Sequence, residues 1–467
     1  MKTIVYTSTL GLVIMVLETL LATFNLLKWR KIILPVTVVG LIAIFCLNLL
    51  GWNVNQGFYH NMVLIDNYSV AFSGLLIVLA IFILILSGNF YKNEETKISD
   101  YLSITIFTLC GALAMVSFGN MAMFFLGLEV MSISLYILAG SKRKDVRSNE
   151  AAMKYFLMGS FASGVLLFGI ALVYGETGSF DIQKIADFVA GGTPSLLYYI
   201  GAGMILVALL FKVSAVPFHF WAPDVYEGSP TVITALMSTI VKTAAFAAFM
   251  RLFMVTFGGV NETWNMILAV IIALSLVISN VTAATQQSVK RMLAYSSISH
   301  AGFMLMAILA NQRGGGSVSA ILYYSLAYSI GSISAFTVLY NVSKQNGNTG
   351  IEAFNGLGKR NPLMAACMVV AMLSLAGIPV TAGFFAKYFV FSVLIGTSFK
   401  WLIILAILTS AVGVYYYFKV IIAMYFKSTE HEESVPMETS HVLLLVITTL
   451  FTIALGLVPN YIIEIFS

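Results

Sequence analysis

The feature that most constrains this chain is a succession of apolar runs, each about 20 residues long, which is the length of a helix that spans a bilayer. Of the 467 residues, 60% are hydrophobic and 10% are charged, whereas a soluble domain has about 25% charged residues. The chain is therefore predicted to be an all-α integral membrane protein. Fourteen runs are expected to form transmembrane helices, at residues 4–27, 32–50, 69–89, 99–118, 121–140, 151–174, 195–220, 231–256, 262–283, 291–311, 317–341, 362–397, 401–426 and 440–466.

Basic residues between the runs predict the orientation of the chain. Of the 25 Lys and Arg residues, 15 follow odd-numbered runs, five lie on the opposite side and five lie within runs. Cytoplasmic loops of membrane proteins carry the excess of basic residues. The loops after odd-numbered runs are therefore expected in the cytoplasm, and both termini on the opposite side.

Two of the runs are interrupted by helix-breaking residues. The twelfth run, 362–397, would be about 54 Å long as one helix, against a hydrocarbon core of about 30 Å. Gly377 and Pro379 lie in its middle, and Pro217 is expected to end the seventh run. Interrupted helices at corresponding positions of two halves indicate inverted repeats that meet at a site near the membrane midplane.

The interruptions predict a division of the chain into four parts. We expect an N-terminal three-helix segment at 1–98, a first five-helix repeat at 99–258, a second at 259–428 and a C-terminal helix at 429–467. The two repeats would be inverted because five is an odd number of spans. The repeat rests on architecture, since the lysines and prolines of the two halves differ in spacing.

Three lysines lie deep within apolar runs: Lys212, Lys242 and Lys387. An ionised side chain near the bilayer centre costs at least about 2.5–3.5 kcal/mol, so such residues usually face protein or water and have a function. The alternative is a structural cation that caps carbonyl groups at a helix break. Lys242 lies too far from either end of its run for its ammonium to reach the interface.

Glu129 is the only acidic residue in its run. It is either a protonated, hydrogen-bonded packing residue or the partner of Lys212. A carboxylate keeps a buried lysine charged, and separation of the two groups lets the desolvated lysine release its proton. The second alternative predicts a switchable proton site.

Four other polar residues have two interpretations each. Lys154 either extends to the interface or belongs to the same pathway, and interfacial extension fits Lys419 better. His300 is either a proton-transfer group or a packing residue. His219 follows the predicted helix break, where loop structure is equally consistent. Haem ligation by the two histidines has no other support in the sequence.

Several kinds of site are absent from the sequence. It has no phosphate-binding loop, no dinucleotide-binding glycine motif and no cysteine cluster for iron–sulfur binding. The chain is therefore expected to hold no cofactor or metal and to have no redox site of its own. Energy for ion movement would come from a gradient or from partner subunits.

Six stretches resemble the proton-translocating, antiporter-like membrane subunits of respiratory complex I, which are similar to multisubunit cation/proton antiporters. The resemblance covers almost the whole chain, and the Lys212 and His300 stretches are the most specific. The stretches are GLEVMSISLYIL at Glu129, NEAAMKYFLMGSFASG at Lys154, FKVSAVPFHFWAPDVYEGSPT at Lys212, the run around Lys242, SVKRMLAYSSISHAGFM at His300 and LSLAGIPVTAGFFAKYFVF at Lys387.

The resemblance implies a translocase subunit in a bacterial inner membrane, with both termini on the periplasmic side. Its partners would be the other membrane and peripheral subunits of complex I and the lipid bilayer, with no nucleic acid. NADH, FMN, iron–sulfur clusters and quinone would lie in those partner subunits. The alternative is a subunit of a multisubunit cation/proton antiporter or of a membrane-bound hydrogenase.

The resemblance also implies residue roles. Glu129 and Lys212 would form a modulating pair, Lys242 the central relay, His300 a bridge and Lys387 the site of a second half-channel. Lys154 matches a pathway position as well. Lys387 stands where one subunit type of the family has an acid, and the chain lacks the long lateral helix of another type after its last run. Both features favour the third type.

Overall fold

The computed structural model describes residues 2–24, 30–92, 98–192, 194–257, 261–310, 316–428 and 433–464. Within these ranges eleven helices are long and apolar enough to cross a membrane, and four shorter apolar helices lie in other predicted runs. The predicted all-α membrane fold is confirmed, whereas the count of fourteen spans stays a prediction. The basic residues Lys28, Lys97 and Arg313, used for the orientation, lie outside the described ranges.

The chain divides into two compact units. The first comprises Met1–Leu209 and Gly228–Gly259, and the second comprises Leu210–Glu227 and Val260–Ser467. The two five-helix repeats and their boundaries stay predictions, and residues 258, 259 and 429 at those boundaries lie outside the described ranges.

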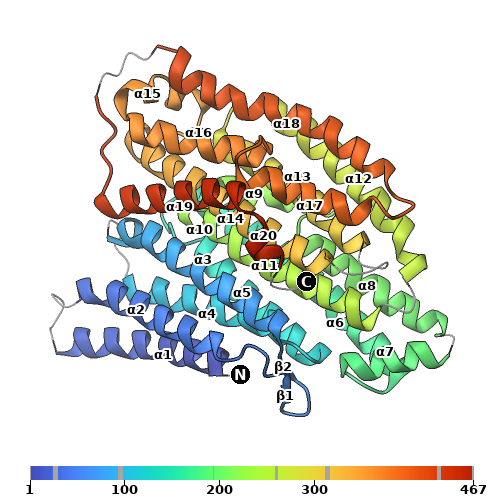
Figure 1. Ribbon diagram of the computed structural model, residues 1–467. Helices are drawn as coiled ribbons and strands as arrows, with labels where there is room; N and C mark the ends of the chain where they lie inside the picture. Colours follow the sequence, from blue (N-terminus) through green and yellow to red (C-terminus); the bar gives the residue numbers. More distant parts are fainter. Residues whose placement is uncertain are drawn as a thin grey trace. The chain divides into compact units, whose positions relative to one another are not determined.

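The first unit contains a short hairpin and twelve helical segments in its described part. α1 and α2 run side by side, and α2 packs against α3 (Figure 1). The elements are α1 (Lys2–Thr23), α2 (Arg30–Leu49), β1 (Gln56–Phe58), β2 (Val63–Ile65), α3 (Asn67–Lys92), α4 (Ile98–Val116), α5 (Met121–Ala139), α6 (Val146–Thr177), α7 (Ile182–Gly191), most of α8 (Leu196–Lys212), and α10 (Thr231–Leu236), η2 (Met237–Val241), α11 (Lys242–Arg251) and η3 (Leu252–Thr256), of which the last four form one rod.

Close packing in the first unit depends on small residues. A Cβ atom at Gly111 of α4 would lie 2.7 Å from the carbonyl oxygen of Gly127 of α5, so the backbones of the two helices meet there. The rod Thr231–Thr256 lies against α3 and α4. The most apolar 18 residues of this rod are all buried, as expected for a central helix that is hydrophobic all round.

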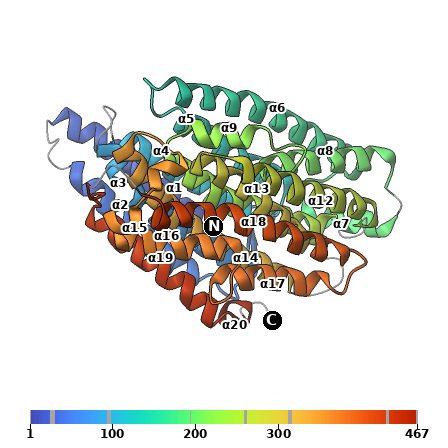
Figure 2. The ribbon, with the colours of Figure 1, turned by 90° about the horizontal axis from the view of Figure 1, so that it is seen from above.

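The second unit is built around α13 and α14, whose apolar stretches are almost entirely buried. α12 lies beside α13, and α18 packs against both (Figure 2). The elements are the end of α8, α9 (Trp221–Gly228), α12 (Asn261–Thr285), α13 (Val289–Ala310), α14 (Ser317–Asn346), η6 (Ile351–Phe354), α15 (Leu357–Arg360), α16 (Pro362–Ala376), α17 (Ala382–Leu394), α18 (Trp401–Phe426), α19 (Thr439–Leu457) and α20 (Asn460–Ile463).

The twelfth predicted run is two helices, α16 and α17, separated by residues 377–381. Gly377 has φ +84°, in the left-handed region that glycine adopts without steric strain. Its N–H donates to the carbonyl of Leu373 and so caps the end of α16. At Gly383 the two helices pack so closely that a Cβ atom would clash with the backbone carbonyl of Ser374. The predicted interruption is therefore present, and it brings the ends of two helices together.

The seventh predicted run is also interrupted. α8 ends at Lys212, residues 213–220 form turns that include Pro217, and α9 begins at Trp221. Ser214 has φ +62° within these turns. The Val216 N–H donates to Ser275 Oγ at 3.0 Å, which gives this buried backbone group of the turns a hydrogen-bond partner.

Candidate functional site

In the first unit, Lys242 lies within the buried rod, and only 2% of the residue is exposed. The π-helical segment η2 (Met237–Val241) ends at this lysine. A single π turn inside an α-helix often marks a functional position, because it changes the direction of the side chains that follow. The sequence predicts the depth of Lys242 but not the π turn.

Glu129 lies in the middle of α5 and is half-buried. Its carboxylate accepts a hydrogen bond from Ser163 Oγ of α6. Glu129 belongs to the first unit and Lys212 to the second, and their pairing stays a prediction.

Lys154 lies near the start of α6 with 41% of its side chain exposed. Its Nζ forms an ion pair with Glu150 Oε1 at 2.8 Å, one helical turn away. Lys154 therefore lies on a partly exposed face of its helix, unlike Lys242.

Near the end of the rod, Arg251 is buried and forms an ion pair with Asp66, with 2.8 Å between Nη2 and Oδ1. The guanidinium also lies 4.7 Å from the ring centroid of Tyr68, whose hydroxyl donates to the carbonyl of Ala247 at 2.6 Å. Burial alone would raise the pKa of Asp66, but Arg251 and hydrogen bonds from Ser69 hold it below its ordinary value. Arg251 is one of the five basic residues expected on the side opposite the cytoplasm, and nothing in the sequence pairs it with Asp66.

In the second unit, Lys212 is the last residue of α8 and is 5% exposed. A cation is favoured at a helix C-terminus, where the free carbonyl groups point. The turns beside it are held by Trp221, whose Nε1 donates to the Phe211 carbonyl at 3.1 Å. His219 lies in the same turns, buried, with its ring centroid 4.5 Å from that of Phe220.

The acidic residues that follow Lys212 in the sequence have a structural role. Arg291 Nη1 of α13 lies 3.0 Å from Asp224 Oδ1 and 2.7 Å from Glu227 Oε2, and all three side chains are about one-third exposed. Lys290 Nζ donates to the Glu227 carbonyl oxygen at 3.0 Å. α9 is thereby fastened to the start of α13.

His300 lies in α13 between two buried tyrosine hydroxyls. Its Nδ1 is 2.7 Å from the hydroxyl oxygen of Tyr324, and its Nε2 is 3.3 Å from that of Tyr417. Tyr417 is also hydrogen-bonded to Ser296 at 2.5 Å. Side chains from α13, α14 and α18 thus form a buried, hydrogen-bonded chain, whose hydroxyl and imidazole groups can accept and donate protons. The sequence predicts the histidine as a candidate but neither tyrosine.

Lys387 lies in the second turn of α17, and its Nζ reaches back to the break, where it donates to the Ala376 carbonyl at 2.8 Å and to Ser410 Oγ at 3.2 Å. The ammonium also lies 4.9 Å from the ring centroid of Phe303. Across the described ranges, Lys387 makes no ion pair. The ring of Phe303 lies 6.1 Å from that of Tyr324, so Lys387 and the His300 chain contact one aromatic cluster.

Lys419 of α18 has a different environment. Its Nζ donates to the carbonyl oxygens of Ala284 and Gln286, at 3.2 and 3.4 Å, at the C-terminal end of α12. These are carbonyl groups that a helix leaves unpaired. The arrangement is that of a capping cation, and it is distinct from the extension to the interface that the sequence suggests.

No group of three or more His, Cys, Asp or Glu side chains in the described part of the chain is placed to hold a metal ion. The polar side chains described above include lysine, histidine, tyrosine and carboxyl groups. All of these transfer protons.

Known proteins are similar to this chain over its full length. The family model described as NADH:quinone oxidoreductase/Mrp antiporter, TM, matches residues 119–413. NADH-quinone oxidoreductase subunit N of Flavobacterium psychrophilum is 47% identical over 466 residues, which cover 100% of both chains. A chain of respiratory complex I from Thermus thermophilus is 31% identical, with a TM-score of 0.81 over 99% of this chain and 98% of that one. A chain of the Mrp complex from Dietzia sp. is similar in fold, at 19% identity and a TM-score of 0.85 over 99% and 95% of the two chains.

Proposed function

Because the chain belongs to the NADH:quinone oxidoreductase/Mrp antiporter transmembrane family, and its full-length relatives are named NADH-quinone oxidoreductase subunit N, we propose that it translocates protons within a complex I. The family resemblance expected from the sequence is confirmed. The subunit type that Lys387 favours is confirmed as well, and it is subunit N. The chain would work beside the other membrane and peripheral subunits of that enzyme. NADH oxidation and quinone reduction, with FMN and iron–sulfur clusters, would take place in those partners.

The observation that carries the proposal is the environment of Lys387. Its ammonium is buried at a helix break and is hydrogen-bonded to a carbonyl and a hydroxyl, which are uncharged. Burial without a carboxylate partner disfavours a permanently charged amine. A lysine in such a place is suited to accept and release a proton.

We assign the proton pathway to six residues in the two units. The first unit would supply Glu129, Lys154 and Lys242, and the second Lys212, His300 and Lys387. His300 supports this assignment best after Lys387, because both of its ring nitrogens lie within hydrogen-bonding distance of hydroxyl groups and a proton can enter at one nitrogen and leave at the other.

The coupling step would be a change in the Glu129–Lys212 pair. While the carboxylate is near, it favours the charged form of the lysine, and its withdrawal favours release of the proton. The excess of basic residues in the loops after odd-numbered spans would place those loops in the cytoplasm and both termini in the periplasm.

The experiment is NADH-driven proton transport by the assembled enzyme in membrane vesicles, normalised to assembled complex. Lys387→Met, Lys212→Met and Glu129→Gln remove one titrating group each and are expected to lower proton transport about 100-fold or more, the scale of losing a positioned acid–base group. Lys184→Met is the matched control, since Lys184 lies exposed on α7. If the Lys387 and Lys212 variants assemble and keep full proton transport, the proposed function of these lysines is wrong.

A further inference from the structure

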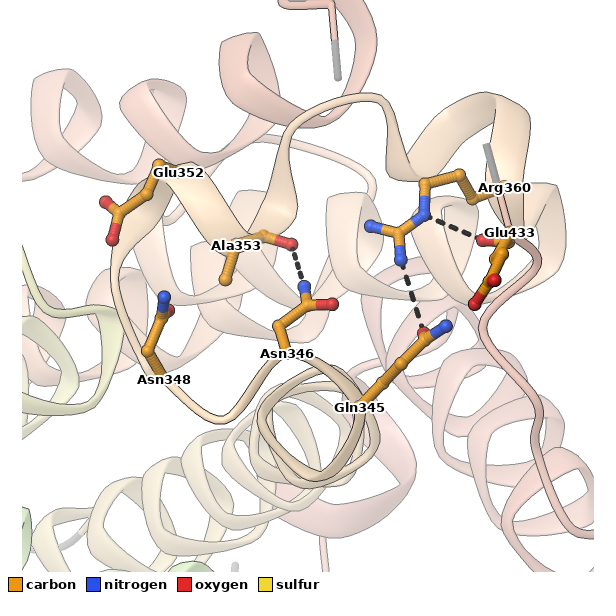
Figure 3. Close-up of a pocket in the computed structure, with 7 residues that line it drawn as sticks. All are labelled: Gln345, Asn346, Asn348, Glu352, Ala353, Arg360 and Glu433. Atoms are coloured by element: carbon orange, nitrogen blue, oxygen red, sulfur yellow. Dashed lines mark hydrogen bonds between the residues drawn. The ribbon is translucent and has the colours of Figure 1, made fainter. Parts of the chain in front are cut away.

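The second unit contains a polar cavity of about 410 Å³ at the C-terminal end of α14 (Figure 3). Its lining includes Gln345, the buried Arg360 and the exposed residues Glu352 and Glu433. Arg360 Nη2 donates to Gln345 Oε1 at 3.3 Å, and Arg360 Nε donates to the Glu433 carbonyl at 2.9 Å. The cavity has two carboxylates and one guanidinium, and it is roomy and polar enough to hold water.

Beneath Gln345, one face of α14 stays polar although the helix is buried. Asn341, Thr337 and Ser334 precede Gln345 in the chain, at successive intervals of four, four and three residues, which places them on the same face of the helix. Asn341 is 7% exposed, Thr337 0% and Ser334 2%. A row of polar side chains therefore continues inward from the cavity.

A matching row lies on α19, which packs against α14. His441 Nδ1 lies 3.2 Å from Asn341 Oδ1 at one end of the helix pair, and the Tyr323 hydroxyl donates to the Leu455 carbonyl at 2.8 Å at the other end. The helices are thus antiparallel, since the end of one faces the start of the other.

This register brings the two polar rows to the same levels. His441, Thr448 and Thr452 share one face of α19, and all three are at most 1% exposed. Counting from the His441–Asn341 contact, Thr448 lies at the level of Ser334, and counting from the Tyr323–Leu455 contact it lies about one helical turn further along α14, at the level of residue 330. We call the six residues the α14–α19 seam: Asn341, Thr337 and Ser334 of α14, and His441, Thr448 and Thr452 of α19.

The inner end of the seam reaches the helix break that holds Lys387. Gly331, three residues before Ser334, faces Leu375 at the end of α16, and an added Cβ would lie 3.8 Å from it. Gly456, four residues after Thr452, meets the Val380 carbonyl in the break. From Gln345 to Gly331 the helix rises about 21 Å.

From this arrangement we propose that the α14–α19 seam is a water-accessible route by which protons pass between the cavity and Lys387. The inference rests on the proposed function, because it supplies one access path to a lysine of the proton pathway. Water molecules in the seam, with its hydroxyl and imidazole groups, would each take one proton from the side of the cavity and release one toward Lys387, so no net charge accumulates; the Asn341 amide would only orient its neighbours by hydrogen bonds.

Ordinary helix packing accounts for only part of the seam. Thr337 and Thr448 donate to the carbonyls four residues earlier, as buried threonines usually do. Ser334 Oγ, however, is buried and has no hydrogen-bond partner among the described residues. Since buried hydroxyl groups nearly always have a partner, this position points to water within the seam.

The test is cysteine accessibility in the assembled complex. In a chain carrying Cys46→Ser, Cys110→Ala and Cys367→Ala, the variants Ser334→Cys and Ala335→Cys are treated in membrane vesicles with a small water-soluble methanethiosulfonate. Ala335 is the matched control, because it is equally buried and its side chain leaves α14 on another face. Ser334→Cys is expected to react at least about tenfold faster than Ala335→Cys, since thiol reactivity depends on access.

Modification of Ser334→Cys is also expected to lower NADH-driven proton transport at least twofold, about 0.4 kcal/mol at RT ≈ 0.59 kcal/mol. Equal reaction rates at 334 and 335 would overturn the seam. So would fast reaction without any loss of transport in a complex whose Lys387→Met variant is inactive, and the proposed function would then stand. If Lys387→Met itself keeps full transport, both proposals fail together.

Discussion

Lys387 Nζ is hydrogen-bonded to the carbonyl oxygen of Ala376, 2.8 Å away, and the two residues belong to different helices. Ala376 is the last residue of α16, so its carbonyl lacks an intrahelical partner. Lys387 lies in the second turn of α17. One ammonium therefore caps the first helix from within the second, and any change in its charge acts on the joint between them.

A substitution at Gly377 tests whether the contact between Lys387 and the end of α16 tolerates an added side chain. Its φ of +84° disfavours any side chain, and a Cβ would lie 2.9 Å from Lys387 Cδ. Gly377→Ala is expected to lower the free energy of unfolding by about 1–2 kcal/mol, the cost of a left-handed alanine, and also to abolish NADH-driven proton transport by displacing Lys387.

Gly178→Ala is the matched control for that substitution. Gly178 ends α6 with φ +67° and has no atom within 4 Å of an added Cβ. It should show a similar loss in thermal unfolding of the purified complex but keep proton transport. Equal transport in the two variants would show that Gly377 has a backbone role alone.

Lys419 should behave differently from Lys387. Its ammonium lies at the C-terminal carbonyls of α12, where a cation stabilises a helix by about 0.3–1 kcal/mol. Lys419→Met is expected to reduce thermal stability slightly and to leave proton transport per assembled complex unchanged. A loss of transport as large as that of Lys387→Met would return Lys419 to the pathway.

The sequence predicted the features that depend on local chemistry. A run of 36 residues with Gly377 and Pro379 in its middle cannot cross a membrane as one helix, and the structure has two helices there. The predicted depth of Lys242 and Lys387 in the membrane followed in the same way from the length of the apolar runs around them.

Features that depend on distant contacts were not predictable. Tyr324 and Tyr417 lie 24 and 117 residues from His300, and nothing distinguishes them among the 22 tyrosines of the chain. Asp66 and Arg251 are 185 residues apart and each lies at an end of an apolar run. Such positions resemble loop charges until the fold brings them together.

The Asp66–Arg251 pair predicts a dependence of stability on pH. The pKa of Asp66 is lower in the folded protein than its ordinary value, so the unfolded chain binds the proton more tightly. The stabilisation is therefore complete above the ordinary pKa of an aspartate and is lost as the pH falls through the folded-state pKa.

Asp66→Asn removes this contribution at every pH. At pH 7 the variant should unfold at a lower temperature than the unsubstituted protein, because Arg251 stays buried without its carboxylate. The difference in unfolding temperature between the two proteins should shrink as the pH falls below the ordinary aspartate range. A difference that stays constant over that titration would mean that Asp66 acts through packing.

Two adjacent tyrosines of α18 differ in whether their hydroxyl contacts His300. The Tyr417 hydroxyl contacts His300 and Ser296, whereas the Tyr416 hydroxyl donates to Asn280 Oδ1 at 3.1 Å. Both tyrosines are 2% exposed, so Tyr417→Phe and Tyr416→Phe each remove one buried hydroxyl at a similar cost in packing.

If protons pass through His300, the two substitutions will differ in transport. Tyr417→Phe removes a group from the chain of hydrogen-bonded side chains and should lower NADH-driven proton transport about two- to twelvefold, the equivalent of one buried hydrogen bond of about 0.5–1.5 kcal/mol. Tyr416→Phe should lose less than half as much. Because one hydroxyl is deleted in each case, an equal loss of proton transport would indicate that the substitutions act by disturbing the packing around α18. Unchanged transport in both variants would remove His300 and Tyr417 from the pathway and leave Lys387 as its site in the second unit.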